Sequence, residues 1–147
     1  ILDQFVRYNP TVKAGCIILD IDIFKQVNDT YGHPMGDKVI KRVAKCIARN
    51  VRKADLVCRW GGEEIVVICF NVTPDRLMAL AEKIRQKVSE LHFAQKEDGF
   101  SVTMSAGVVT GEPQSNSTQF LEDLVGRADK ALYEAKQNGR NQVVSAD

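Results

Sequence analysis

Two groups of acidic residues are the part of this sequence best suited to carry out chemistry. Asp20 and Asp22 follow a short apolar run, and Glu63 and Glu64 follow the pair Gly61-Gly62. Carboxylate oxygens are preferred ligands of hard cations such as Mg²⁺ or Mn²⁺, and a site with few carboxylates leaves coordination positions for phosphate oxygens. Glycine lets another molecule approach the backbone closely. The two groups together predict a metal-assisted reaction at a phosphate.

Both groups also have a plainer explanation. Gly-Gly is a common turn between strands, because glycine accepts the positive φ that a two-residue turn needs, and acids beside it are often only solvated. One of Asp20 and Asp22 is expected to cap the helix that follows, but not both.

Alternation along a strand places the side chains of Asp20 and Asp22 on one face. If their strand lies beside the hairpin that turns at Gly61-Gly62, Asp20 and Glu63 can share one cation.

The elements that position these acids are expected to form one α/β unit. A continuous apolar run at 15–19 predicts a central strand. Further expected elements are a helix tail at 2–7, a short helix at 24–31, a longer helix with Asp37 as its N-cap, strands at 56–58 and 65–70, a helix after Asp75, a strand at 100–108, a polar loop at 111–118, a helix ending at 138–139, and an edge strand at 143–144. Because the two hairpin strands run antiparallel, the sheet is predicted to be mixed.

Composition narrows the class of protein. The chain has 147 residues with 44% hydrophobic residues, enough for one domain with a core. A net charge of +1 gives no bulk electrostatic case for nucleic acid. No apolar run approaches the roughly 20 residues of a membrane span. The four cysteines form no Cys-x-x-Cys pair, which argues against zinc and favours reduced thiols in a cytoplasmic domain.

Residues 61–65 read Gly-Gly-Glu-Glu-Ile and resemble the signature of the GGDEF family, the bacterial diguanylate cyclases. Stretches that agree with the family pattern, in the same order, are 19–25, 27–33, 36–37 and 128–141. The resemblance implies an α/β (α+β) fold shared with class III nucleotide cyclases and polymerase palm domains, with a mixed, largely antiparallel sheet flanked by helices. It implies one catalytic domain over residues 1–147. Because the chain begins at Ile1, we expect an N-terminally truncated fragment of a longer protein.

The reaction implied by the resemblance is condensation of two GTP molecules into cyclic di-GMP with release of pyrophosphate, using Mg²⁺ or Mn²⁺. Each domain is expected to hold one GTP, so catalysis needs a homodimer in which two domains face each other. A sensor or regulatory domain is expected upstream. The domain itself is expected to be cytoplasmic and to contact neither nucleic acid nor membrane, although the longer protein could be membrane-anchored.

The resemblance also implies roles for single residues. Asp20, the carbonyl of Ile21 and Glu63 are expected to hold the metal. Glu63 is further expected to assist deprotonation of the ribose 3′-hydroxyl, and Glu64 to help place metal or charge. The residues expected to bind GTP are Asn28 and Asp37 at the guanine edge with His33 nearby, Gly61 and Gly62, the backbone amides of Ile23, Phe24 and Lys25, and Lys136 and Arg140 at the triphosphate. The alternative for Lys136 and Arg140 is a solvated helix end.

A second site is implied by Arg52 and Asp55, which match the family's Arg-x-x-Asp site for inhibition by its own product. Lys83 stands where many product-inhibited members carry a further arginine, and lysine lacks the bidentate fork. The alternative is a surface ion pair that contributes at most about 1 kcal/mol. Ile65, in place of the family's usual phenylalanine, is expected to alter packing only.

Two other functions remain open from the sequence. A catalytically silent module that senses GTP or cyclic di-GMP would use the same fold, but the intact acids and glycines favour the enzyme. Another purine nucleotide cyclase is disfavoured by Asn28 and Asp37, because a carboxylate accepts from guanine groups that adenine lacks.

Overall fold

The computed structural model of the chain describes residues 13–95, 98–113 and 116–147, and the helix tail predicted at 2–7 lies outside them. The elements, in chain order, are β1 (Ala14–Ile21), α2 (Phe24–Tyr31), α3 (His33–Asn50), β2 (Leu56–Gly61), β3 (Glu64–Phe70), α4 (Pro74–Ser89), β4 (Phe93–Gln95), β5 (Asp98–Phe100), β6 (Met104–Gly111), α5 (Ser117–Gln137) and β7 (Val143–Ser145). None of the described helices is long and apolar enough to cross a membrane.

The main sheet has the strand order β2-β3-β1-β6-β7, and a separate hairpin is formed by β4 and β5. β1 pairs antiparallel with both β3 and β6, whereas β7 pairs parallel with β6. The predicted mixed, largely antiparallel sheet is therefore confirmed, as are the glycine hairpin and the edge strand at 143–144. The short helix predicted at 24–31 has those bounds in the structure.

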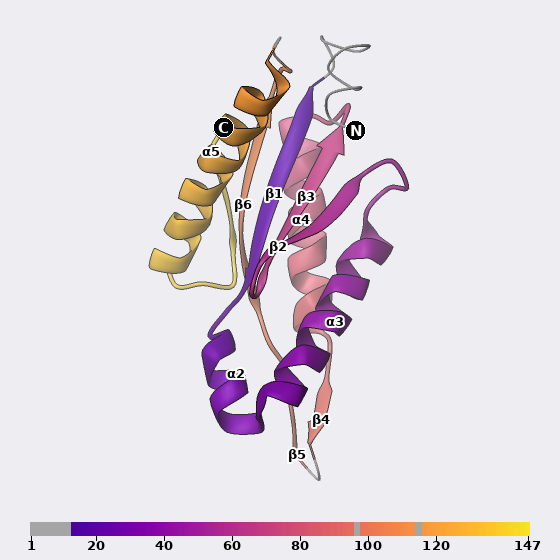
Figure 1. The fold of residues 1–147 in the computed structure, drawn as a ribbon, viewed down its shortest axis with the longest axis vertical. Helices are drawn as coiled ribbons and strands as arrows, with labels where there is room; N and C mark the ends of the chain where they lie inside the picture. The colour runs from indigo at the N-terminus through magenta and orange to yellow at the C-terminus, as the bar shows by residue number, and fades with distance from the viewer. Residues whose placement is uncertain (1–12, 96–97, 114–115) are drawn as a thin grey trace.

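Helices cover both faces of the sheet (Figure 1). Alternate residues of β1 enter two cores: Ile17 and Leu19 pack on the side of α3 and α4, and Cys16 and Ile18 pack on the side of α5. A strand covered on both faces reads as one continuous apolar run, which is why β1 shows no alternation in sequence. Asp20 belongs to the same set of alternate positions as Ile18, so it lies on the α5 side.

One glycine allows α5 to lie directly on the sheet. A Cβ added to Gly107 of β6 would stand 2.1 Å from the carbonyl oxygen of Ala128 and 2.4 Å from the backbone nitrogen of Leu132. Both atoms belong to the backbone of α5, so no side-chain rotation could relieve the clash. The spacing between α5 and β6 therefore depends on the missing side chain at position 107.

Two predicted boundaries are wrong for identifiable reasons. Asp37 is not the N-cap of α3, because the helix already begins at His33, after Gly32 with φ 90° and with Pro34 in its first turn. Proline is well suited to that turn because its missing N–H would lack a helical partner anyway. The strand predicted from Phe100 begins at Met104 instead, and Phe100 pairs with Phe93 in the β4–β5 hairpin.

Candidate active site

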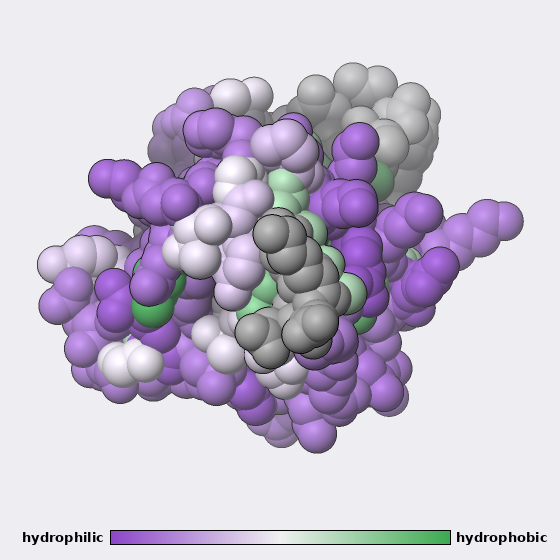
Figure 2. Space-filling model, turned by 90° about the horizontal axis from the view of Figure 1, so that it is seen from below, coloured by the Kyte–Doolittle hydropathy of each residue, from purple (hydrophilic) through white to green (hydrophobic). Residues whose placement is uncertain are grey.

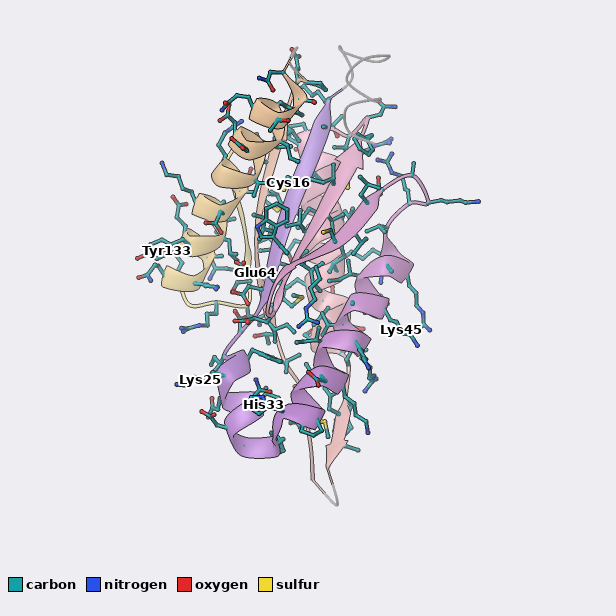
Figure 3. All side chains as sticks on the ribbon, in the orientation of Figure 1. Cys16, Lys25, His33, Lys45, Glu64 and Tyr133 are labelled. Atoms are coloured by element: carbon teal, nitrogen blue, oxygen red, sulfur yellow. The ribbon has the colours of Figure 1, made fainter. Side chains whose placement is uncertain are left out.

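The acids predicted to share a site do meet at one edge of the sheet. Asp20, Glu63 and Glu64 form this acid edge. Asp20 lies at the end of β1 directly opposite Glu64 of β3, and Glu64 in turn pairs with Gly61 of β2. Glu63 and Glu64 both act on the titration of Asp20, which places their carboxylates near it. Figure 3 shows Glu64 at the hairpin end of β3. The end of β1 thus lies beside the hairpin, as the shared-cation hypothesis requires.

The hairpin turns at Gly62 and Glu63, but its glycines are not explained by backbone conformation. The glycines with positive φ in the described residues are Gly32 and Gly139, so the reason given for the glycine pair from sequence is wrong. A Cβ on Gly62 would meet no atom within 4 Å, and one on Gly61 would meet only Glu64 Oε2 at 3.6 Å. The space over the turn is open, which suits close approach by another molecule.

Asp20 is a buried carboxylate that is only half satisfied. The residue is 4% exposed, and its Oδ2 accepts a hydrogen bond from the Lys136 ammonium. Its Oδ1 has no hydrogen-bond partner. Burial raises the pKa of Asp20 from 3.8 to about 6, with Glu63 and Glu64 adding to the rise and Lys136 opposing it. An unpaired buried carboxylate oxygen is costly, and a cation would satisfy it.

The residues present fit a divalent cation. Asp20 Oδ1 is free to bind, Glu63 is close, and Ile21 supplies a carbonyl at the end of the same strand. The described residues contain no preformed group of three or more histidine, cysteine or acidic side chains arranged to hold a metal. A small oxygen-ligand set of this kind is typical of Mg²⁺ sites that keep water or phosphate oxygens as their remaining ligands.

Asp22 has a structural role that the sequence did not reveal. Its carboxylate accepts hydrogen bonds from Thr103 Oγ1 at 2.7 Å, Ser105 Oγ at 2.6 Å and the Asn141 backbone N–H at 3.0 Å. These contacts tie the end of β1 to β6 and to the segment after α5. The polar positions on the strand predicted at 100–108 were the available signal, but their partner could not be identified without the sheet register.

The turn from β1 into α2 presents backbone amides beside the acids. Ile23 is the N-cap of α2, with φ 55° and no side-chain cap, so the prediction that Asp20 or Asp22 caps this helix is wrong. The first N–H groups of a helix lack intrahelical acceptors. The amides of Phe24 and Lys25 are in that position, while the Lys25 side chain extends outward (Figure 3).

The residues predicted to read guanine lie where α2 meets α3. A Cβ on Gly36 would stand 1.9 Å from Asn28 Oδ1, so the glycine allows the Asn28 side chain to lie against α3. Asp37 follows Gly36 and is exposed. His33 is exposed at the start of α3. The structure therefore brings Asn28 next to the Gly36-Asp37 segment, with His33 one turn away.

The two predicted triphosphate cations differ in their surroundings. Lys136 reaches across to Asp20 and its side chain is 34% exposed, so it is not a solvated helix-end cation. Arg140 lies beyond the end of α5 and is exposed, with φ 66°. Its backbone N–H donates to the carbonyl of Ala135, within α5, at 2.9 Å. The role of Arg140 as a triphosphate ligand stays a prediction.

Arg52 and Asp55 form a tight local unit at the opposite end of β3. Asp55 Oδ1 accepts from Arg52 Nη2 at 3.0 Å, and its Oδ2 accepts from Arg52 N at 2.9 Å and Nε at 3.3 Å. The Asp55 side chain is 0% exposed and that of Arg52 is 52% exposed. The hydrogen bond to Asp55 raises the pKa of Arg52. Arg52 also donates to the carbonyl of Phe70, about 20 Å along β3 from Glu64. Lys83 is exposed on α4.

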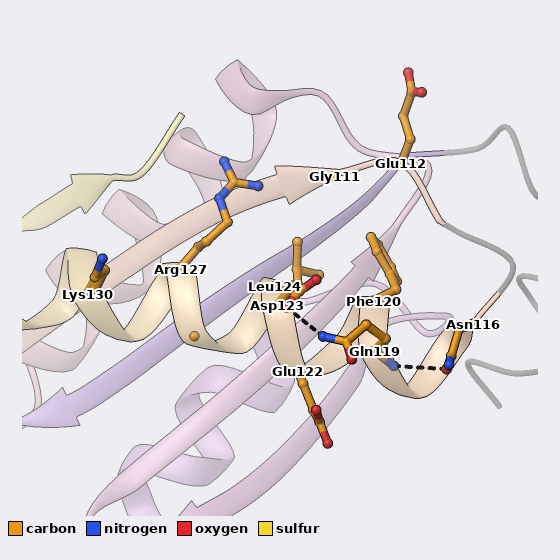
Figure 4. Close-up of a pocket in the computed structure, with 11 residues that line it drawn as sticks. Gly111, Glu112, Asn116, Gln119, Phe120, Glu122, Asp123, Leu124, Arg127 and Lys130 are labelled. Carbon is orange, nitrogen blue, oxygen red and sulfur yellow. Dashed lines mark hydrogen bonds between the residues drawn. The ribbon is translucent and has the colours of Figure 1, made fainter.

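Cavities near the acids are open hollows of moderate size. One of about 450 Å³ lies between the hairpin and α5 and is lined by Glu64 and the exposed Trp60, and one of about 350 Å³ is lined by Asp22 and Ile23. A larger cavity, of about 750 Å³, lies beside α5 and the end of β6 (Figure 4). Its lining, which includes Phe120 and Arg127, contains none of the predicted site residues, so volume alone does not locate the chemistry.

The fold agrees with comparisons to known proteins. A family model described as diguanylate cyclase, GGDEF domain, matches residues 3–142. The chain therefore belongs to the GGDEF family, as its sequence motifs predict.

Relatives and solved structures support the same assignment. Diguanylate cyclase A of Treponema denticola is 46% identical over 127 residues, which cover 86% of this chain and 33% of that protein. The probable diguanylate cyclase DgcT of Escherichia coli K12 is 46% identical over 134 residues, covering 89% of this chain and 29% of that protein. The chain thus spans a third or less of the length of these relatives.

Among solved structures, the GGDEF domain of DgcB from Caulobacter crescentus, in complex with c-di-GMP, superposes with a TM-score of 0.88 at 32% identity, covering 99% of this chain and 85% of that one. The active GGEEF domain of a diguanylate cyclase from Vibrio cholerae superposes with a TM-score of 0.84 at 32% identity, covering 98% and 88%. The predicted fold class is confirmed.

Proposed function

We propose that this domain is a metal-dependent diguanylate cyclase that condenses two GTP molecules into cyclic di-GMP and releases two pyrophosphates. The observation that carries the proposal is the unpaired Oδ1 of buried Asp20, which lies beside Glu63, Glu64 and the open glycine turn. Family membership supports it, and named relatives are diguanylate cyclases.

In the proposed reaction each ribose 3′-hydroxyl attacks the α-phosphate of the other GTP, and pyrophosphate leaves. Glu63 takes up the hydroxyl proton as the new P–O bond forms between the 3′-oxygen and the α-phosphate. Asp20, the Ile21 carbonyl and Glu63 would hold a divalent cation, which would supply Lewis-acid polarisation and neutralise charge that develops on the phosphates. Glu64, opposite Asp20, keeps the edge negative so that cation binding is favoured there.

GTP is positioned by groups on three elements. The amides of Ile23, Phe24 and Lys25 bind phosphate oxygens at the start of α2. Asp37 accepts hydrogen bonds at the guanine edge and Asn28 hydrogen-bonds to the same edge, with His33 beside them. Gly61 and Gly62 let the phosphates approach the hairpin backbone. Lys136 and Arg140 supply positive charge to the triphosphate.

Two GTP molecules must come from two domains. An added Cβ at Gly62 would meet no atom within 4 Å, so none of the described residues covers the turn at this point. A second domain is needed to supply the other nucleotide, and we propose that a homodimer does so. This arrangement allows control by domain placement, which a regulatory domain elsewhere in a longer protein could set.

Product inhibition is proposed at Arg52 and Asp55, about 20 Å along β3 from the acid edge. Arg52 already uses Nε and Nη2 toward Asp55, so the pair presents a preoriented arginine whose side chain is 52% exposed. Cyclic di-GMP bound there would fix domains in an arrangement in which their GTP sites do not meet. Lys83 supplies charge without a planar fork.

A silent GTP- or cyclic di-GMP-binding module is the second candidate. One observation favours it: Lys136 already pairs with Asp20 through Oδ2, beside the Oδ1 to which a metal would bind. The two candidates differ in turnover. The domain, alone and fused to a parallel coiled-coil dimer, is incubated with GTP and Mg²⁺, and the products are separated by chromatography. We expect cyclic di-GMP and pyrophosphate from GTP and not from ATP, with a higher rate for the fusion. GTP binding without product in both forms would select the silent module.

A further inference from the structure

The outer side of α3 carries positive charge that the proposed reaction does not use. From Lys38 to Arg49 six positions of the helix are exposed; five of them are cations and the sixth is Ala48. The cations are Lys38, Lys41, Arg42, Lys45 and Arg49. Asp37 is the only acid of α3, so the helix has a net charge of +4 from five cations and one acid, against +1 for the whole chain. The rest of the chain is therefore net acidic.

This charge does not serve the stability of the helix. Lys41 and Lys45 stand four positions apart, as do Lys45 and Arg49, and like charges at this spacing destabilise a helix. The helix dipole favours cations in the last turn, which accounts for Arg49 and not for Lys38 or Lys41. None of the ion pairs between described residues involves a cation of α3. The helix thus presents unpaired, mutually repelling charge along its whole outer side.

Three of these cations border a groove with α4. Arg42, Lys45 and Arg49 line a cavity of about 490 Å³ together with Lys87 of α4. Its lining also contains Cys46, Leu91 and a single acid, Glu90. Burial raises the pKa of the Cys46 thiol, whereas Lys87 and Arg49 act to lower it, which places both cations near this lining residue. Four cations therefore converge on one hollow.

The groove is partly preorganised. The Arg42 guanidinium lies 4.6 Å from the centre of the Phe93 ring and donates Nη1–H to the His92 carbonyl at 2.6 Å. An arginine already held in place loses less side-chain freedom when it binds a ligand. Lys45 extends away from the body of the protein on the outer side of α3 (Figure 3).

The described surroundings lack the apolar and aromatic side chains with which a surface inserts into a membrane or stacks on single-stranded nucleic acid. The large exposed hydrophobic residues among those described are Ile23, Trp60 and Tyr133, none of which lies on α3 or α4. A helix that lies in a membrane surface inserts apolar side chains, and single-stranded nucleic acid is held by stacking on aromatic rings. At the end of the molecule formed by α2, the start of α3 and β4–β5, hydrophilic residues form the periphery, and near-neutral and weakly hydrophobic residues lie at the centre (Figure 2).

Carboxylates match the groove in chemistry and in spacing. Arginine forms bidentate hydrogen bonds with carboxylates. Arg42, Lys45 and Arg49 recur at intervals of three and four, and Arg42 and Arg49 are two turns, about 10 Å, apart along the axis. A helix lying along the groove with acids at the same intervals would meet all three cations at once.

We propose that the α3–α4 groove, defined by Arg42, Lys45, Arg49 and Lys87, is a docking site for an acidic helix of another protein. The helix carries carboxylates at positions i, i+3 and i+7. This site is independent of GTP turnover, because none of its residues belongs to the acid edge.

The probe is a fluorescent alanine-based peptide of about 18 residues with glutamate at i, i+3 and i+7. A second peptide has glutamine at those positions. Anisotropy titrations with the domain should show binding of the glutamate peptide at least about tenfold tighter than the glutamine peptide. Lys45→Glu/Arg49→Glu should weaken it at least about tenfold, whereas Lys53→Glu/Lys130→Glu, the same charge change at exposed sites elsewhere, should change it less than about twofold.

Four results would overturn the proposal. Equal binding of the two peptides, or equal weakening by the two double variants, would reduce the effect to net charge. Binding of phosphatidylserine vesicles or duplex DNA in place of the peptide would assign the surface to another class of partner. Self-association in sedimentation that Lys45→Glu/Arg49→Glu abolishes would make the occupant a second copy of this chain. GTP turnover should be unchanged in either double variant.

Discussion

Two buried aspartates at opposite ends of the sheet differ in how well their charge is satisfied. Asp55 accepts three hydrogen bonds from Arg52, so both of its oxygens have partners. Asp20 has a partner for Oδ2 only, and Glu63 and Glu64 add negative charge beside it. The first arrangement is complete within the chain, whereas the second is left for a cation to complete. An incompletely satisfied charge therefore locates the chemistry better than burial or cavity volume does.

The largest expected effect is on turnover at the acid edge. Glu63→Gln keeps the shape of the side chain and removes the charge that binds metal and accepts the proton. A loss of about 4 kcal/mol of transition-state stabilisation corresponds to about a thousandfold in rate. Cyclic di-GMP formation is measured by chromatography and folding by circular dichroism. Glu134→Gln, an exposed glutamate of α5, serves as control and should retain its rate. Near-normal activity of a folded Glu63→Gln variant would remove the assigned role.

Asp55→Asn should destabilise the domain by about 2–3 kcal/mol, because an amide N–H₂ would face the donors of Arg52 in a fully buried position. Urea unfolding measures the difference. The matched change Asp29→Asn, at an exposed position of α2, should cost less than about 0.5 kcal/mol. A small effect at Asp55 would show that the unit behaves as an ordinary surface pair.

In contrast to Asp55→Asn, which should destabilise the domain, Asp20→Asn should leave the free energy of unfolding unchanged or raise it. The pKa of Asp20 is raised from 3.8 to about 6 on folding, chiefly by burial, so the folded state holds the proton more tightly than the unfolded chain. The stability of the wild type relative to Asp20→Asn should therefore fall as pH rises from 4 to 6 and level off above 6, by at most about 3 kcal/mol.

Unfolding of both proteins across this pH range, without divalent cation, measures the difference. Addition of Mg²⁺ at pH 8 should stabilise the wild type more than Asp20→Asn, because a ligand of the folded state stabilises it by mass action. A flat difference from pH 4 to 8 would contradict the raised pKa.

The smallest expected effect concerns Lys136, whose ammonium occupies one oxygen of Asp20. Lys136→Met removes this competitor, so Mn²⁺ should bind about tenfold more tightly without nucleotide, as followed by electron paramagnetic resonance. GTP affinity should fall, because a triphosphate contact is lost. Lys130→Met, an exposed change on the same helix, should alter neither. Weaker Mn²⁺ binding by Lys136→Met would show that the lysine supports the metal rather than competing with it.

Local patterns predicted much of the fold. Apolar runs and turn residues gave the strand at 15–19, the helix at 24–31 and the hairpin, because these depend on neighbours in sequence. The start of α3 was misplaced because Gly32 and Pro34 together outweigh a good N-cap residue at Asp37. The β4–β5 hairpin was missed because its described strands are only three residues long.

The site was predictable in its residue types and less so in its contacts. The paired carboxylates Asp20/Asp22 and Glu63/Glu64 pointed to metal chemistry. The family motifs supplied the nucleotide-binding roles, which stay predictions. The pairing of Lys136 with Asp20 spans 116 positions in sequence. The hydrogen bonds of Asp22 likewise depend on the register of β1 against β6. No periodicity within a single segment carries that information.

The missing side chain at Gly107 has a mechanical consequence. Backbone atoms of α5 lie within 2.4 Å of where its Cβ would be, so α5 and β6 interlock without intervening side chains that could rearrange. Lys136 is carried by that helix and Asp20 by the strand next to β6. A regulatory signal from outside therefore cannot easily be absorbed by rearrangement within the domain. We expect such a signal to rotate or translate the whole domain as a rigid body, so that control is exerted on the placement of domains and not on their interior.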